Sequence, residues 1–349
     1  MKRMSLLLIV SMLIITACDL NKPNNKTFPV ITRENVGSLT QVSSYENKWI
    51  AEMAWMSDGL SIAACCDVSG QIFIIDSQTL EANKMNISQK YYSHHLAVSP
   101  IDNLVAIITG EFQHVEIWKV EPQDLLMTLG DRENEFIDVV SFSPDGKLIA
   151  TGGWDFLGIY KPTVILWDLT TGERVKEINL VNVGGAPGWD QFIKNLAFSP
   201  DGKQLAALAW DRSVHLWNIK KGRIEMILPK EEGDIQHSAL TFSPKGNLLA
   251  VGNGPFTNNL RILDINSGEI VFNLKKPKGV VRSVSFNPDG TLIAACLNSA
   301  VHMWDIESGD LLTVLDTPPI SSIAFNQEGT LLATTGRSDG LHLWGLPVR

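Results

Sequence analysis

Residues 139–153 read VVSFSPDGKLIATGG, and this stretch decides the fold. Its centre, Pro144-Asp145-Gly146, is a tight-turn signal, because proline presets φ, aspartate bonds its own backbone and glycine accepts a positive φ. Apolar residues alternate with small or polar residues on both sides of the turn, as in two short β-strands. The stretch therefore predicts a β-hairpin.

Variants of this hairpin recur along the rest of the chain, which indicates a repeat protein. The seven copies are residues 52–66, 95–109, 139–153, 195–209, 239–253, 283–297 and 322–336. A third apolar run follows each copy, at residues 72–76, 115–119, 164–168, 214–218, 260–264, 301–305 and 341–345. A fourth run follows a turn that contains Ser or Thr and Gly, as in TTGERVKEINL at residues 170–180. The sequence thus predicts seven units of short strands.

This pattern resembles the WD40 repeat, and the resemblance covers residues 37–349. The family's Trp-Asp pair stands at Trp167-Asp168 and Trp304-Asp305, whereas its Gly-His pair before each blade is absent. The family's turn aspartate between the second and third strands is matched at Asp155, Asp211 and Asp339, with Asn298 in the sixth unit. The departures bear on hydrogen bonds inside the blades rather than on the fold.

The resemblance implies an all-β fold, a seven-bladed β-propeller of four-stranded antiparallel blades around a central channel. The seventh unit stops after its third strand, LHLWG, at residues 341–345. A spare strand-like run, GSLTQVSSY, precedes the first unit at residues 37–45. We expect this N-terminal strand to complete the seventh blade and close the ring, because closure leaves few strand edges open.

The N-terminus begins with a basic start and an apolar stretch. Lys2 and Arg3 precede the mostly apolar residues 5–17. A membrane-spanning helix needs about 20 apolar residues, so this shorter stretch is typical of a signal peptide.

The residues that follow resemble the bacterial lipobox, in the form Ile15-Thr16-Ala17-Cys18. The resemblance implies cleavage before Cys18, lipidation of this cysteine, and anchoring by its acyl chains at the extracytoplasmic side of a cell-envelope membrane. We therefore expect a signal peptide at residues 1–17, a lipidated cysteine with a flexible tether at 18–36, and the propeller at 37–349.

Charge and motifs exclude several classes of function. The formal net charge is −9, and removal of Lys2 and Arg3 takes it to −11. Nucleic-acid binding needs a basic footprint, so we expect no nucleic-acid partner. The chain holds no nucleophile elbow, HExxH motif or P-loop. We therefore expect no enzyme activity and no cofactor. We also expect no metal site, because His215, His302 and His342 share one strand position in different blades, which reflects the repeat rather than a metal cluster.

Partners of WD40 proteins commonly bind the top face, formed by connections into each first strand and by turns between second and third strands. The sequence places aromatic residues at these positions: Trp49, Tyr92, Phe136, Phe192, Trp154 and Trp210. Enlarged connections at residues 153–163, 181–192 (with Trp189) and 252–259 project from the same face. Exposed aromatic patches mark binding sites, although these rings could instead pack under the loops.

Charged residues occur at related positions. Asp138, Lys194, Arg282 and His94 lie four residues before the apolar or aromatic residue that ends each first strand, and we expect them near the channel mouth. Two acidic groups fall in top-face connections: Asp131, Glu133 and Glu135, and then Glu231, Glu232 and Asp234. They indicate solvated loop charge or an acidic rim that attracts a basic partner.

The function favoured by these features is a non-catalytic, monomeric scaffold that binds a protein or peptide partner through its top face. A glycosidase-like hydrolase on the propeller is the alternative, with paired carboxylates drawn from Asp138, Asp155 and Asp190. A small-ligand or redox-cofactor propeller resembling quinoproteins is a third hypothesis, and their different tryptophan motif counts against it.

Overall fold

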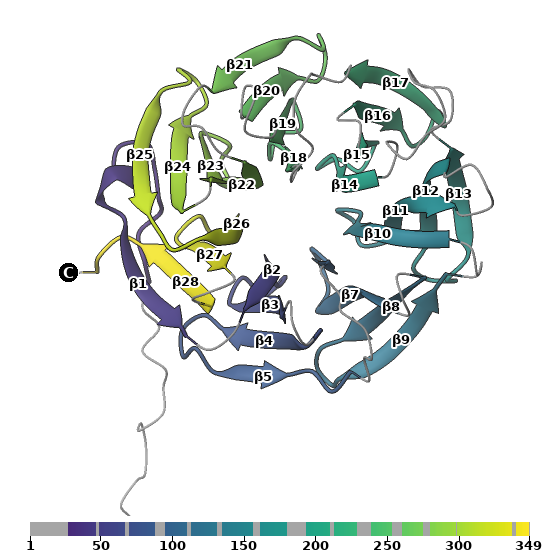
Figure 1. Cartoon of the computed structure of the whole chain (residues 1–349), viewed down its shortest axis with the longest axis horizontal. Coiled ribbons are helices and arrows are strands. Elements are labelled where there is room, and N and C mark those ends of the chain that lie inside the picture. Colours follow the sequence, from purple (N-terminus) through teal and green to yellow (C-terminus); the bar gives the residue numbers. More distant parts are fainter. Residues whose placement is uncertain are drawn as a thin grey trace, which may run out of the picture.

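The computed structural model describes residues 27–46, 49–66, 70–87, 95–109, 113–130, 135–155, 161–179, 193–209, 213–228, 239–252, 260–274, 280–297, 299–336 and 340–348. Seven four-stranded antiparallel sheets stand as blades in a ring (Figure 1). The predicted all-β, seven-bladed propeller is confirmed. Within the described part of the chain, no helix has the length and apolar character needed to cross a membrane.

The first four blades follow the chain from the inner strand outward. Blade one holds β2 (Ile50–Trp55), β3 (Ser61–Cys66), β4 (Ile72–Asp76) and β5 (Ala82–Lys84). Blade two holds β6 (Leu96–Val98), β7 (Leu104–Thr109), β8 (His114–Lys119) and β9 (Asp124–Leu129). Blade three holds β10 (Glu135–Phe142), β11 (Leu148–Asp155), β12 (Lys161–Asp168) and β13 (Arg174–Asn179). Blade four holds β14 (Ile193–Phe198), β15 (Gln204–Ala209), β16 (Val214–Asn218) and β17 (Arg223–Leu228).

The last three blades include the one that mixes both ends of the chain. Blade five holds β18 (Leu240–Phe242), β19 (Leu248–Gly252), β20 (Leu260–Asp264) and β21 (Ile270–Leu274). Blade six holds β22 (Val281–Phe286), β23 (Leu292–Leu297), β24 (Ala300–Asp305) and β25 (Leu311–Asp316). Blade seven holds β26 (Ile320–Phe325), β27 (Leu332–Gly336), β28 (Gly340–Gly345) and β1 (Thr40–Tyr45), which follows the 3₁₀ helix η1 (Val36–Ser38).

The closing strand lies where the sequence predicts it. β1 pairs with β28, with Thr40 opposite Gly345 and Tyr45 opposite Leu341, and Figure 1 shows purple β1 beside yellow β28. Across the next seam, the Trp55 indole N–H donates to the Ala324 carbonyl at 3.1 Å. The two ends of the chain therefore complete one sheet.

The core consists of seven apolar clusters, one in each seam between neighbouring blades. The inner strands of each blade are thus covered on both faces. This explains near-continuous apolar runs such as β23, whose six residues are all buried. Successive strand residues point to opposite faces, so Cys65 packs in the seam between blades one and two and Cys66 in the seam between blades one and seven.

The turns between the first and second strands, Pro-Asp-Gly or a variant of it, lie on the bottom face, the face opposite the top, and they contact one another around the ring. A Cβ built on Gly202 would meet the ring of Pro144 at 3.4 Å, and one built on Gly246 would meet Pro200 at 3.3 Å. The same contact repeats between Pro244 and Gly290, and between Pro288 and Gly329. The motif therefore joins neighbouring blades as well as turning the chain.

The two residues of the Trp-Asp pair have different roles: the aspartate forms a turn, and the tryptophan packs inside the blade. Asp168 accepts the backbone N–H groups of Thr170 and Thr171 at 2.7 and 3.1 Å, which fixes the turn into the fourth strand. The Trp167 indole N–H donates to the Thr151 hydroxyl of the adjacent strand at 2.9 Å. Although the Gly-His pairs are absent, blade three keeps this internal bond, and Trp344 and Thr334 form its counterpart in blade seven at 3.0 Å.

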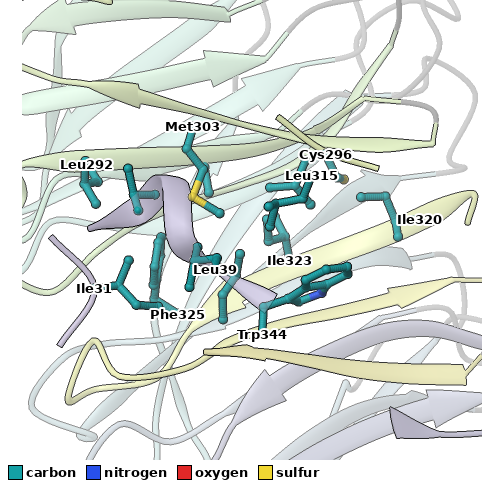
Figure 2. Packing of buried hydrophobic residues seen from close by; sticks show 14 of the residues in the cluster. Ile31, Leu39, Leu292, Cys296, Met303, Leu315, Ile320, Ile323, Phe325 and Trp344 are labelled. Carbon is teal, nitrogen blue, oxygen red and sulfur yellow. The ribbon is translucent and has the colours of Figure 1, made fainter. Parts of the chain in front are cut away.

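Part of the segment before β1 packs against the ring. Ile31 and Val36 are fully buried between blades six and seven, in the cluster shown in Figure 2. The backbone N–H of Ile31 donates to the carbonyl of Gly329 at 2.8 Å. These contacts place Ile31 and Val36 against the ring, ahead of the first strand.

Candidate functional site

The first strands of five blades carry an irregularity near their top ends. In blade three, Ile137 pairs with Gly153 and Val139 with Gly152, so Asp138 has no cross-strand partner. The equivalent extra residues in the other blades are Ala51, Lys194, Arg282 and Ser321. Such β-bulges redirect side chains and are common next to functional sites. Backbone geometry shared between the repeats therefore sets where the side chains at these positions lie.

A row of alternating charges crosses the tops of blades one to four. His95 Nδ1 lies 3.3 Å from Glu52 Oε2, and the same carboxylate oxygen accepts the Leu96 backbone N–H at 2.9 Å. His95 in turn interacts electrostatically with Asp138, and Asp138 with Lys194. We call Glu52, His95, Asp138 and Lys194 the charge row.

Burial and neighbouring charges shift two pKa values in this row. Burial lowers the pKa of His95, but the adjacent Glu52 carboxylate and, to a smaller extent, Asp138 together outweigh it, so the net pKa is raised. Burial raises the pKa of Asp138, and the Lys194 and His95 cations offset only part of this effect. The fold therefore resists the charged form of Asp138, which is typical of a carboxylate retained for function rather than stability.

The raised pKa gives a stability prediction for Asp138→Asn. The carboxylate is destabilising wherever it is ionised, so the neutral amide is expected to raise the thermal midpoint at pH 7. The gain disappears as the pH falls from the raised folded pKa to below the ordinary value of 3.8, because the carboxyl group is then protonated in both states. Thermal unfolding followed by circular dichroism between pH 3 and pH 7 measures the effect.

Asp201→Asn is the matched control with the opposite sign. Hydrogen bonds from Ser199 and Lys203 lower the pKa of Asp201 to about 2. Its carboxylate therefore stabilises the fold above its ordinary pKa, and the amide is expected to lower the thermal midpoint at pH 7. A lower midpoint for Asp138→Asn, of the same size as for Asp201→Asn, would contradict the assignment.

The structure places three of the aromatic residues expected on the top face. Trp49 directly precedes β2 and has 52% of its surface exposed. Phe136 and Trp154 are cross-strand partners in blade three, and their half-buried rings stack at 4.3 Å with planes 9° apart. Packing thus accounts for this pair in part, while Trp49 presents an open indole. Tyr92, Phe192, Trp189 and Trp210 lie outside the described residues.

Most of the other residues predicted for the site are described only in part or not at all. Arg282 is half-buried at the blade-six bulge. Asp155 ends β11, where only its backbone is described. Cys18, His94, Asp190 and most of the two acidic groups fall outside the described residues. Of the three carboxylates named for a hydrolase, only the side chain of Asp138 is described. Among the residues that the structure describes, no group of His, Cys, Asp or Glu could hold a metal ion.

Two members of the charge row, Glu52 and His95, are absent from the sequence-based prediction. Each lies three residues before the last residue of its first strand, Trp55 and Val98. Opposite charges at the same repeat position in neighbouring blades were a signal that could have identified the pair.

Comparison with known proteins agrees with this architecture. The family described as "WD domain, G-beta repeat" matches residues 124–157, 183–218, 268–305 and 309–345. With seven four-stranded blades, the protein is a WD40-repeat seven-bladed β-propeller. WD40 propellers are usually non-catalytic and typically act as protein-binding scaffolds.

The individual relatives are distant. A chromatin assembly factor 1 subunit of Mus musculus is 24% identical over 254 residues, which are 60% of this chain and 41% of that protein. Small ribosomal subunit protein RACK1 of Caenorhabditis elegans is 23% identical over 265 residues, 62% of this chain and 78% of that protein. The chain spans about two fifths of the length of the chromatin assembly factor proteins that it matches.

Proposed function

We propose that this propeller is a non-catalytic scaffold, lipid-anchored through Cys18 at the outer side of a bacterial membrane, that binds a protein partner over its top face. The exposed indole of Trp49, three residues from Glu52 in the charge row, is the observation that supports the binding site most directly. The relatives are named as a subunit of one assembly and as a protein of the small ribosomal subunit, which fits a role in binding other proteins.

Exposure of the apolar surface of Trp49 to water is unfavourable, and burial of this surface against a partner would be favourable. A buried tryptophan covers about 150–250 Å², so leaving half of this area in water forgoes roughly 2–3 kcal/mol at about 25 cal/mol per Å². Tryptophan is enriched among the few residues that dominate binding energy at interfaces. Trp49 is therefore the residue whose truncation reports on binding at this face.

The charge row supports specificity rather than affinity. Its signs alternate from Glu52 to Lys194, so a partner segment with charges of both signs complements it better than a purely basic one. Complementary charges at an interface chiefly select the partner and raise the association rate. This differs from the acidic rim considered from the sequence, most of whose residues lie outside the described part of the chain.

The test is a crosslinking pull-down from membranes with wild type, Trp49→Ala and Val175→Ala. Val175 is 54% exposed on the outer strand β13, away from the top face, and so serves as the matched control. We expect wild type and Val175→Ala to capture the same defined protein, and Trp49→Ala to weaken its binding by at least about tenfold, since a hot-spot residue contributes about 2 kcal/mol or more.

Two outcomes of this comparison would contradict a binding site on the top face. Equal capture by all three proteins would place the binding surface elsewhere on the propeller. Loss of capture with Val175→Ala alone would move the site to the outer strands and overturn the top-face assignment.

A further inference from the structure

Residues 28–39 hold the chain to the bottom face at the seam between blades six and seven. The backbone N–H of Ile31 donates to Gly329 in the turn between β26 and β27 at 2.8 Å. Arg33 reaches the turn after β24, with Nε 3.3 Å from Asp305 and Nη1 2.9 Å from Glu307. Both turns belong to the bottom face, so this segment lies across it.

Apolar side chains fix the same segment to the ring. Ile31 is fully buried, and Val36 and Leu39 are 1% and 7% exposed. Figure 2 shows Ile31 and Leu39 among side chains of blades six and seven, including Met303 and Phe325. Burial of these three apolar side chains stabilises the packing of the segment against the ring.

The direction of β1 shows that the chain enters the propeller from the bottom face. β1 begins at the bottom, where Thr40 pairs with Gly345, and ends at the top, where Tyr45 pairs with Leu341. Phe28 still packs against the propeller, beside Leu331. It lies only ten residues after Cys18, and a chain of ten residues spans at most about 33–36 Å.

We propose that the bottom face, at the seam between blades six and seven, stands toward the membrane, and that the top face points away from it. This inference rests on the proposed lipid anchor at Cys18. Its consequence concerns the partner: Trp49 and the charge row face the aqueous compartment, so they bind a soluble protein or the extramembrane domain of a membrane protein, not a segment lying at the lipid surface.

Energy transfer to labelled lipids tests the orientation. Glu328 is exposed in the bottom turn of blade seven, and Ser299 is exposed in the top turn between β23 and β24. Glu328→Cys and Ser299→Cys each take a maleimide donor dye, because Cys65, Cys66 and Cys296 are buried. The lipidated proteins are placed in vesicles of phosphatidylethanolamine and phosphatidylglycerol that contain rhodamine-labelled phosphatidylethanolamine.

We expect higher transfer efficiency from Glu328→Cys than from Ser299→Cys. Equal or reversed efficiencies overturn the orientation. Cys18→Ala separates this failure from failure of the anchor: a Cys18→Ala protein that leaves the membrane fraction supports the anchor, whereas one that stays in it overturns the anchor and with it the orientation.

Discussion

Gly153→Ala is expected to destabilise the propeller by about 2–3 kcal/mol, as overpacking of a close-packed site does. A Cβ at this position would overlap the carbonyl oxygen of Phe136, a backbone atom on the neighbouring strand that has no rotamer with which to move away. Gly153 pairs with Ile137, immediately before the bulge at Asp138. The substitution therefore strains the backbone feature that places Asp138, and thermal or urea unfolding measures the loss.

Gly37→Ala is the matched control for this change. Gly37 lies in η1, and nothing lies within 4 Å of a Cβ built on it. The free energy of unfolding of the Gly37→Ala protein should stay within about 0.5 kcal/mol of wild type, as is usual for surface substitutions. Equal stability of Gly153→Ala and Gly37→Ala would mean that the strands of blade three can part without cost, contrary to the described packing.

Trp304→Ala is expected to cost about 3–5 kcal/mol, the usual range for truncation of a buried aromatic residue. Trp304 is 2% exposed in the seam between blades five and six, and it stacks on His302 with ring centroids 5.7 Å apart. Removal of the indole leaves a cavity that rigid sheets on both sides cannot fill. The measurement is again the free energy of unfolding, by urea titration.

The same substitution at Trp49 should cost clearly less than Trp304→Ala, because about half of the surface of Trp49 is already in water. Trp304→Ala thus alters folding while Trp49→Ala alters partner capture. If Trp49→Ala proves as destabilising as Trp304→Ala, Trp49 is a packing residue, and the proposed binding role loses its main support.

The architecture could be predicted because its signals are local and repeated. Turns such as Pro144-Asp145-Gly146 specify hairpins within a few residues, and seven copies specify the number of blades. The closing strand followed from counting strands, and the structure pairs it with β28.

Features that join separate repeats could not be predicted in this way. The contact of Pro200 with Gly246 depends on how neighbouring blades stack. The ion pair of Glu52 and His95 joins two repeats 43 residues apart and depends on how their first strands align. Burial of Ile31 depends on the apolar seam between blades six and seven, which only the assembled ring provides. Of the aromatic residues, sequence placed Trp154 on the top face but could not show that it stacks on Phe136.

The closing strand also determines how the molecule would bear a mechanical load. A pull on the chain ahead of residue 28 first meets the Arg33 ion pairs and the Ile31 hydrogen bond. Behind them, β1 lies antiparallel to β28, and bonds between such strands run perpendicular to the strand axis. Tension along β1 therefore acts in shear on the whole ladder at once instead of opening it one bond at a time. A propeller tethered by this end would resist tearing at the very blade where its ring is closed.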